Sequence, residues 1–169
     1  SRAVAWCRQA AAAEAGLART LRAAAGPAMT YQVIYSSQAT RPLTEADLEA
    51  ILADARAGNE QRGITGALVF IDGVFLQVLE GEKSDVLDLM RHIASDTRHS
   101  AVKVFHAAEI EAPTFSSWRM AQVDATAEQL AIWAGLPGAA SMASILDEIH
   151  RNSIQASQVA VRMLEAIYP

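Results

Sequence analysis

The 169-residue sequence contains a single cysteine, Cys7. One cysteine excludes an intramolecular disulfide framework and a cysteine-rich metal site, and it fits a reducing compartment. The apolar runs are also far shorter than the roughly 20 residues that a membrane-spanning helix needs. We therefore expect a cytoplasmic protein that has no membrane segment and no metal site.

Basic residues are also few: 14 Lys and Arg stand against 19 Asp and Glu, for a net charge of −5. They are scattered, whereas binding to nucleic acid or anionic lipid depends on clustered Lys and Arg. The sequence has neither a GxGxxG motif nor a P-loop, the glycine-rich segments that bind nucleotide phosphates. We expect no nucleic-acid or membrane partner, and any bound phosphate would have to be met by side-chain charge.

Hydrophobic residues make up 51% of the sequence and charged residues 20%, which is the composition of a globular protein. A chain of this length can bury one core of substantial size and carry one or two additional helices. We divide it into an Ala-rich N-terminal extension (1–28) that is dispensable or not native, a central domain (29–124) and a C-terminal helical region (125–169).

Periodicity in the central region predicts the element order βαββαβ. A capping box beginning at Thr44 starts the first helix, Ser84 caps the second, and Asp72-Gly73 forms a two-residue hairpin turn. The predicted strands cover residues 31–36, 66–71, 74–80 and about 102–110. This order is the ferredoxin-like α+β arrangement, in which two helices cover one face of an antiparallel sheet and the first and third strands are central neighbours.

The C-terminal region is predicted to add a fifth strand near Met120–Val123 and then helices. A second capping box begins at Thr126, and apolar residues at helical spacing predict one longer amphipathic helix from about Ser141 to Ile167. We expect these helices to pack on the sheet face that the first two leave bare. An apolar stripe also favours an interface, so we expect a homo-oligomer or a separate partner protein.

One uncharged amide, Gln77, interrupts the otherwise apolar run 74–79. A buried amide without hydrogen-bond partners costs roughly 1–3 kcal/mol. If the predicted topology is right, Tyr35 on the first strand lies next to Gln77, which shares a face with Phe75 and Leu79 by strand alternation. Taken alone, a strand tyrosine and a buried amide are more often structural than functional.

Five motifs follow one another over about residues 30–123, more than half of the chain. They are Ile34-Tyr35-Ser36-Ser37, Asn59 with Gly63–Leu68, Phe75–Gly81, Asp96–His99 and Phe115–Met120. In this order and spacing they resemble the BLUF family of flavin-based blue-light sensors, in its short single-domain type. The resemblance implies a photoreceptor, not an enzyme, that binds oxidised FAD non-covalently, with FMN or riboflavin as alternatives.

The resemblance also implies a site. The flavin ring would lie between the two helices on the sheet face, and its apolar lining would be Ile51, Ile64, Leu68 and Phe75. Asn59 would hydrogen-bond the polar edge of the ring, because its amide offers both a donor and an acceptor. Arg98 and His99 would face the ribityl phosphate, although a basic pair after a helix is usually just a solvated helix end.

By the same resemblance, Tyr35 gives an electron to the excited flavin, and the amide of Gln77 then rotates or tautomerises to face a different flavin atom. Trp118 and Met120 would relay the change to the C-terminal helices and a downstream signalling protein; plain core filling is the alternative. Two other functions are disfavoured, because the sequence shows no motif for the site that each would need. A flavin-dependent redox enzyme would need a substrate site, and an RNA-binding fold would need exposed aromatics and a basic surface.

Overall fold

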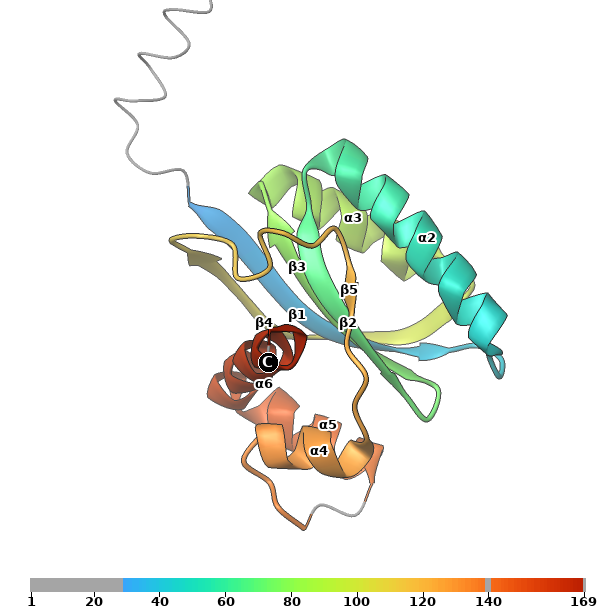
Figure 1. Cartoon of the computed structure of the whole chain (residues 1–169), viewed down its shortest axis with the longest axis vertical. Coiled ribbons are helices and arrows are strands. Elements are labelled where there is room, and N and C mark those ends of the chain that lie inside the picture. Colours follow the sequence, from blue (N-terminus) through green and yellow to red (C-terminus); the bar gives the residue numbers. More distant parts are fainter. Residues whose placement is uncertain (1–28, 139–140, 169) are drawn as a thin grey trace, which may run out of the picture.

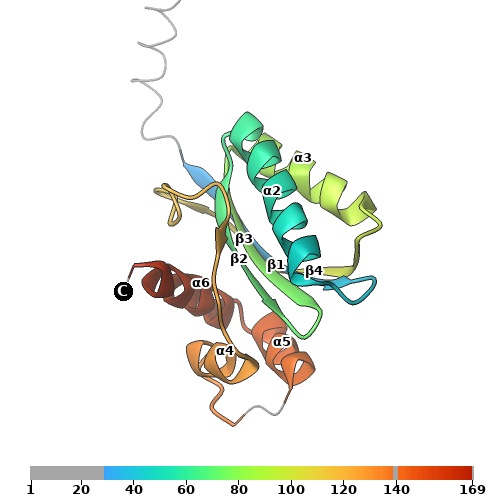
Figure 2. The same ribbon diagram turned by 45° about the vertical axis from the view of Figure 1, so that its right-hand side comes forward.

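The computed structural model describes residues 29–138 and 141–168, so the predicted N-terminal extension lies outside the described residues. A five-stranded sheet in the order β4-β1-β3-β2-β5 carries helices on both faces (Figures 1 and 2). The elements are β1 (Thr30–Ala39), α2 (Glu45–Arg62), β2 (Thr65–Ile71), β3 (Val74–Gly81), α3 (Lys83–Ser95), β4 (His99–Ile110), β5 (Ala121–Gln122), α4 (Ala127–Trp133), α5 (Met142–Arg151) and α6 (Ser153–Ile167).

The central strands follow the predicted topology, and the α+β class with the order βαββαβ is confirmed. The turn between β2 and β3 has φ angles of 50° at Asp72 and 78° at Gly73, the left-handed values that a tight type I′ hairpin turn requires. Strand β1 pairs antiparallel with β3, and this register sets Tyr35 directly opposite Gln77. The short β5 adds to β2 in parallel.

Two of the three helix starts predicted from the sequence agree with the structure. Both capping boxes form, at Thr44 and at Thr126, and each pairs the hydroxyl and backbone of the first residue with the third residue after it. The predicted cap at Ser84 is wrong. Helix α3 begins at Lys83, and its N-cap, Glu82, makes no side-chain capping bond. Because Glu82 leaves β3 with an extended backbone, the helix begins before Ser84 is reached.

The single C-terminal helix predicted for 141–167 is also wrong, because the structure divides it into α5 and α6 at Asn152. Asn152 has an extended backbone (φ −137°, ψ 98°), and its side-chain oxygen accepts a hydrogen bond of 3.1 Å from the backbone N–H of Ile154. Asparagine competes with the helix for backbone hydrogen bonds in this way. It ends one helix and caps the next.

The two faces of the sheet bury two separate cores. Helices α2 and α3 cover one face, where the buried cluster includes Val33, Leu52, Leu68 and Val86. Helices α4, α5 and α6 cover the opposite face, as expected, over a cluster that includes Ile34, Leu76, Phe115 and Ile149 (Figure 2). Strand alternation sends neighbouring residues of β1 and β3 to opposite faces, so each strand contributes to both cores.

No helix among the described residues has the length and apolar character needed to cross a membrane. Within residues 29–138 and 141–168, no group of three His, Cys, Asp or Glu side chains could hold a metal ion.

Candidate functional site

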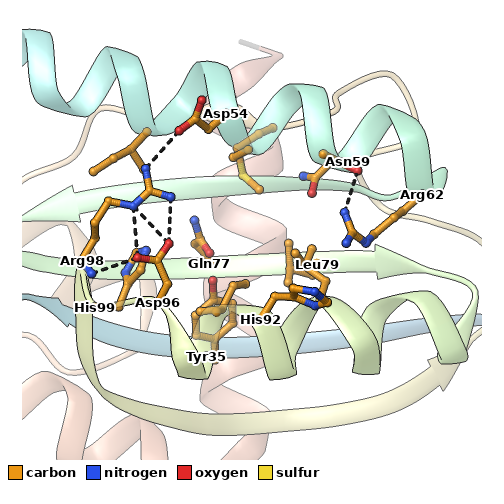
Figure 3. Close-up of a pocket in the computed structure, with 16 residues that line it drawn as sticks. Tyr35, Asp54, Asn59, Arg62, Gln77, Leu79, His92, Asp96, Arg98 and His99 are labelled. Atoms are coloured by element: carbon orange, nitrogen blue, oxygen red, sulfur yellow. Dashed lines mark hydrogen bonds and ion pairs between the residues drawn. The ribbon is translucent and has the colours of Figure 1, made fainter.

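A cavity of about 250 Å³ lies between α2, α3 and the sheet face that these helices cover (Figure 3). Seven residues singled out from the sequence line it: Tyr35, Ile51, Asn59, Gln77, Arg98, His99 and Met120. Strands β1 and β3 supply its floor, and α2 supplies one wall. Its lining also includes the charged residues Asp54, Arg62 and Asp96.

Four other expected residues lie away from the cavity surface. Ile64, Leu68 and Phe75 are fully buried in the core on this face of the sheet, in the same cluster as Tyr35. Trp118 is 38% exposed on the protein surface. The side chains of Ile64, Leu68 and Phe75 therefore pack beneath the cavity floor. Trp118 and Met120 occupy different environments, although only one residue separates them.

Tyr35 and Gln77 form the centre of the floor. Tyr35 is fully buried and Gln77 is 6% exposed. The Tyr35 hydroxyl has no hydrogen-bond partner within the described part of the chain, and in Figure 3 it points toward the Gln77 side chain. Burial raises the pKa of the Tyr35 phenol far above its ordinary value, so the group stays neutral and keeps its proton to donate.

Helix α2 holds the segment that leads into β5. The Asn59 amide, which is 2% exposed, donates to the backbone oxygen of Arg119 at 2.6 Å. One turn earlier, Arg56 Nε donates to the backbone oxygen of Met120 at 3.0 Å. The backbone beside the cavity is therefore fixed by side chains of the helix that forms its wall.

An arginine spans the opening of the cavity. Arg98 forms hydrogen bonds to both oxygens of Asp96 (2.8 Å for its shortest) and reaches Asp54 on α2 at 3.0 Å (Figure 3). The bond from Arg98 lowers the pKa of the Asp96 carboxyl, and the same bond raises the pKa of Arg98. Both groups are therefore charged at neutral pH, and Arg98 connects α2 to the turn between α3 and β4.

His99 lines the cavity next to Arg98. Its Nδ1 lies 3.1 Å from Ser37 Oγ, and its ring centroid lies 5.0 Å from that of Phe75. Desolvation by burial lowers the pKa of His99; the Asp96 charge opposes this shift and the Arg98 charge adds to it. His99 is thus a neutral, positioned ring at physiological pH.

Several contributing residues were not predicted. Asp54 and Arg56 lie on the exposed side of an amphipathic pattern, and no local signal indicates that they meet residues 44 and 64 positions away. For Glu80, the sequence did contain a signal that the side chain needs hydrogen-bond partners. A carboxylate that directly follows an apolar strand run, and that turns out to be fully buried, must find partners.

The family model described as BLUF, sensors of blue-light using FAD, matches residues 30–121. The chain belongs to the BLUF family. Photoactivated adenylate cyclase subunit beta of Euglena gracilis is 39% identical to this BLUF chain over 109 residues, which is 64% of the chain but 12% of the relative. The chain thus corresponds to a small part of that curated relative.

Solved structures agree with this assignment. The dark-state structure of BlrB, a BLUF protein, has a TM-score of 0.56 and 28% identity, and covers 78% of this chain and 98% of its own. The structure of Klebsiella pneumoniae BlrP1 with FMN and cyclic diGMP has a TM-score of 0.53 and 30% identity, over 73% of this chain and 30% of that one. As a BLUF protein, the chain carries a flavin-binding blue-light photoreceptor domain.

The residues at the cavity suit a flavin. The Tyr35 phenol, which has no partner among the described residues, lines one cavity together with the amides of Gln77 and Asn59, and a flavin ring presents carbonyl and N–H groups along one edge. The volume is slightly below the about 300–1,000 Å³ of typical ligand pockets. These three polar side chains are the ones that could bond such a ring.

Proposed function

We propose that this BLUF protein senses blue light by rearranging hydrogen bonds among Tyr35, Gln77 and a bound oxidised flavin, which we expect to be FAD, with FMN or riboflavin as alternatives. The observation that carries the proposal is the buried Tyr35 hydroxyl, which has no partner within residues 29–138 and 141–168 and belongs to the residue paired with Gln77 in the register of β1 and β3. Such a group costs about 1–3 kcal/mol. The fold therefore keeps a donor ready for a partner that the described chain does not itself supply.

The flavin would supply the absorption of blue light and an acceptor for one electron. Tyr35 enters the reaction neutral, because burial raises its pKa, and would pass its hydroxyl proton to the Gln77 amide as it loses the electron. The electron and the proton would both return to Tyr35 once the amide has rearranged. Gln77 suits the next step because the two ends of an amide are nearly equal in size and opposite in hydrogen-bonding sense. Reversing the amide would place a donor where an acceptor stood.

A route for the signal is supported by contacts of the segment before β5. Met120 lines the cavity, and the preceding backbone oxygen, of Arg119, accepts from Asn59. Two residues before Met120, the Trp118 indole N–H donates to the Tyr168 hydroxyl at 2.7 Å, just after α6. One short segment thus touches both the cavity and the end of the C-terminal helices, and a shift of Met120 would alter the Trp118 contact.

We further propose that the chain acts in the cytoplasm as a sensor without enzymatic activity of its own, and that its output passes to a second copy or to a separate signalling protein. Ile132, Ile154 and Val161 on α4 and α6 are 59%, 67% and 50% exposed. Exposed apolar side chains that cluster favour an interface. The alternative, a flavin-dependent redox enzyme, would need a reductant and a substrate to turn over in the dark.

An absorption spectrum of the purified protein before and after blue light tests the proposal. We expect a small red shift of the flavin band that reverses in the dark. The variants Tyr35→Phe and Gln77→Leu should each retain flavin and lose the shift entirely, whereas Tyr31→Phe, a matched change on the same strand, should keep it.

A normal photocycle in either Tyr35→Phe or Gln77→Leu would show that the switch lies elsewhere. Sustained oxidation of a nicotinamide cofactor in the dark would favour the enzyme. A protein that binds no flavin would exclude both functions.

A further inference from the structure

Arg98 holds two carboxylates at the opening of the cavity, and they come from different elements. Asp96 lies in the same turn, accepts from Nε and Nη2 of the guanidinium, and also accepts from the Arg98 backbone N–H at 2.9 Å. Asp54 comes from α2 on the opposite side of the opening and accepts from Nη1 at 3.0 Å. The guanidinium is therefore bonded on both sides.

The charges around this contact do not favour an anion. Arg98 contributes one positive charge, and the two carboxylates contribute two negative charges, so the cluster is net negative. Three of the five guanidinium N–H groups of Arg98 already bond a carboxylate, and an approaching flavin phosphate also meets charge of its own sign. This arrangement engages Arg98 in ion pairs with Asp54 and Asp96 and does not favour a phosphate.

The two carboxylates differ in how readily they could release Arg98. Asp96 is held by side-chain and backbone bonds, and its side chain is 26% exposed. Asp54 makes one contact to Arg98, and its side chain is 69% exposed, so water can replace the arginine at little cost. Asp54 is therefore the partner that an incoming phosphate would displace.

We propose that Asp54 determines how strongly this site distinguishes phosphorylated from unphosphorylated flavins, by competing with the flavin phosphate for Arg98. This inference rests on the proposed function, since it assumes that the ring occupies the cavity with its side chain at the opening. With Asp54 present, the phosphate gains little, and riboflavin and FMN bind with similar affinity. Without the carboxylate, Arg98 is free to bind the phosphate.

Flavin-free full-length protein titrated with riboflavin and with FMN tests this inference, because binding quenches flavin fluorescence. The measured quantity is the ratio of the two dissociation constants. Asp54→Asn keeps the shape of the side chain and removes its charge, and we expect FMN to gain about fivefold relative to riboflavin, the upper range for an exposed ion pair. Glu49→Gln makes the same change of charge on α2 away from the cavity lining and should leave the ratio unchanged.

A second variant identifies the arginine as the site of competition. In Arg98→Gln, the added change Asp54→Asn should shift the ratio much less than it does alone. An unchanged ratio in Asp54→Asn, or an equal change in Glu49→Gln, would overturn the inference while flavin binding itself stands. Failure of the unmodified protein to bind either flavin would instead overturn the proposed function, and this inference with it.

Discussion

Strand β3 places one buried polar side chain on each face of the sheet, and the two faces treat them differently. On the face of α4–α6, the Glu80 carboxylate accepts one hydrogen bond from the Gln32 side chain and one from the Phe115 backbone, each 2.8 Å long. On the cavity face, Gln77 lies opposite the Tyr35 hydroxyl, which has no partner among the described residues. A satisfied polar group holds the fold, whereas an unsatisfied group beside a cavity marks a place for a ligand.

Glu80 also supports the floor of the cavity. Glu80 lies three residues after Gln77 on the same strand, and its bond to the Phe115 backbone fixes the start of the segment that carries Trp118 and Met120. One strand thus connects the floor of the cavity to the segment that leaves it.

If Glu80 and Gln77 contribute equally to stability, the contrast between the two faces of the sheet is wrong. Glu80→Leu leaves the Gln32 amide and the Phe115 N–H without their partner, and should lower the free energy of unfolding by about 3 kcal/mol. Gln77→Leu should change it by less than about 1 kcal/mol, because an apolar side chain of similar size fits its surroundings. Urea unfolding of the flavin-free variants, followed by circular dichroism, gives both values. Similar losses would contradict the contrast.

Tyr35→Phe tests the Tyr35 hydroxyl by itself, because it removes this group, which has no partner among the described residues, and keeps the ring. Without flavin, this variant should be more stable than the unmodified protein by about 1 kcal/mol, since an unsatisfied hydroxyl is no longer buried. With flavin bound, the advantage should disappear. Thermal unfolding with and without flavin measures the difference, and Tyr31→Phe serves as the control. A loss of stability without flavin would mean that the hydroxyl has a partner in solution.

The smallest expected effect concerns His99 on the cavity face. Burial lowers its pKa from the ordinary value of 6.5, so the unfolded chain takes up the proton more readily than the folded protein. The contribution of His99 to stability is therefore complete above that value and is lost as the pH falls through it. The urea midpoint at about pH 7.5 and about pH 5.5 measures this loss, which should be smaller in His99→Gln. An identical pH dependence in the variant would contradict the assignment.

Much of this site could be predicted from the sequence because its centre depends on local patterns. The Asp72-Gly73 turn and the alternation along β3 together determine which residues share a face with Gln77, and the element order makes β1 its neighbour. These patterns predict that β1 and β3 are neighbours, whereas the register that sets Tyr35 opposite Gln77 depends on the tertiary structure. The two capping boxes were predictable, since each involves residues only three positions apart.

The contacts around that centre could not be predicted. Arg98 could have faced solvent, and its bond to Asp54 depends on how α2 docks against the sheet, 44 positions away in sequence. Trp118 and Met120 belong to one motif, yet the structure exposes the first and buries the second. A motif specifies which side chains are present, and docking of the segment specifies where they point.

The sequence by itself determined the element order, the β2–β3 turn and two helix caps, because these signals act over a few residues. Only the tertiary structure decided that the phenol lacks a partner while Glu80 has two, that Asn152 divides the last helix, and that an ion pair spans the opening. These features arise where segments distant in sequence meet. Their hydrogen bonds depend on distances that no local pattern encodes.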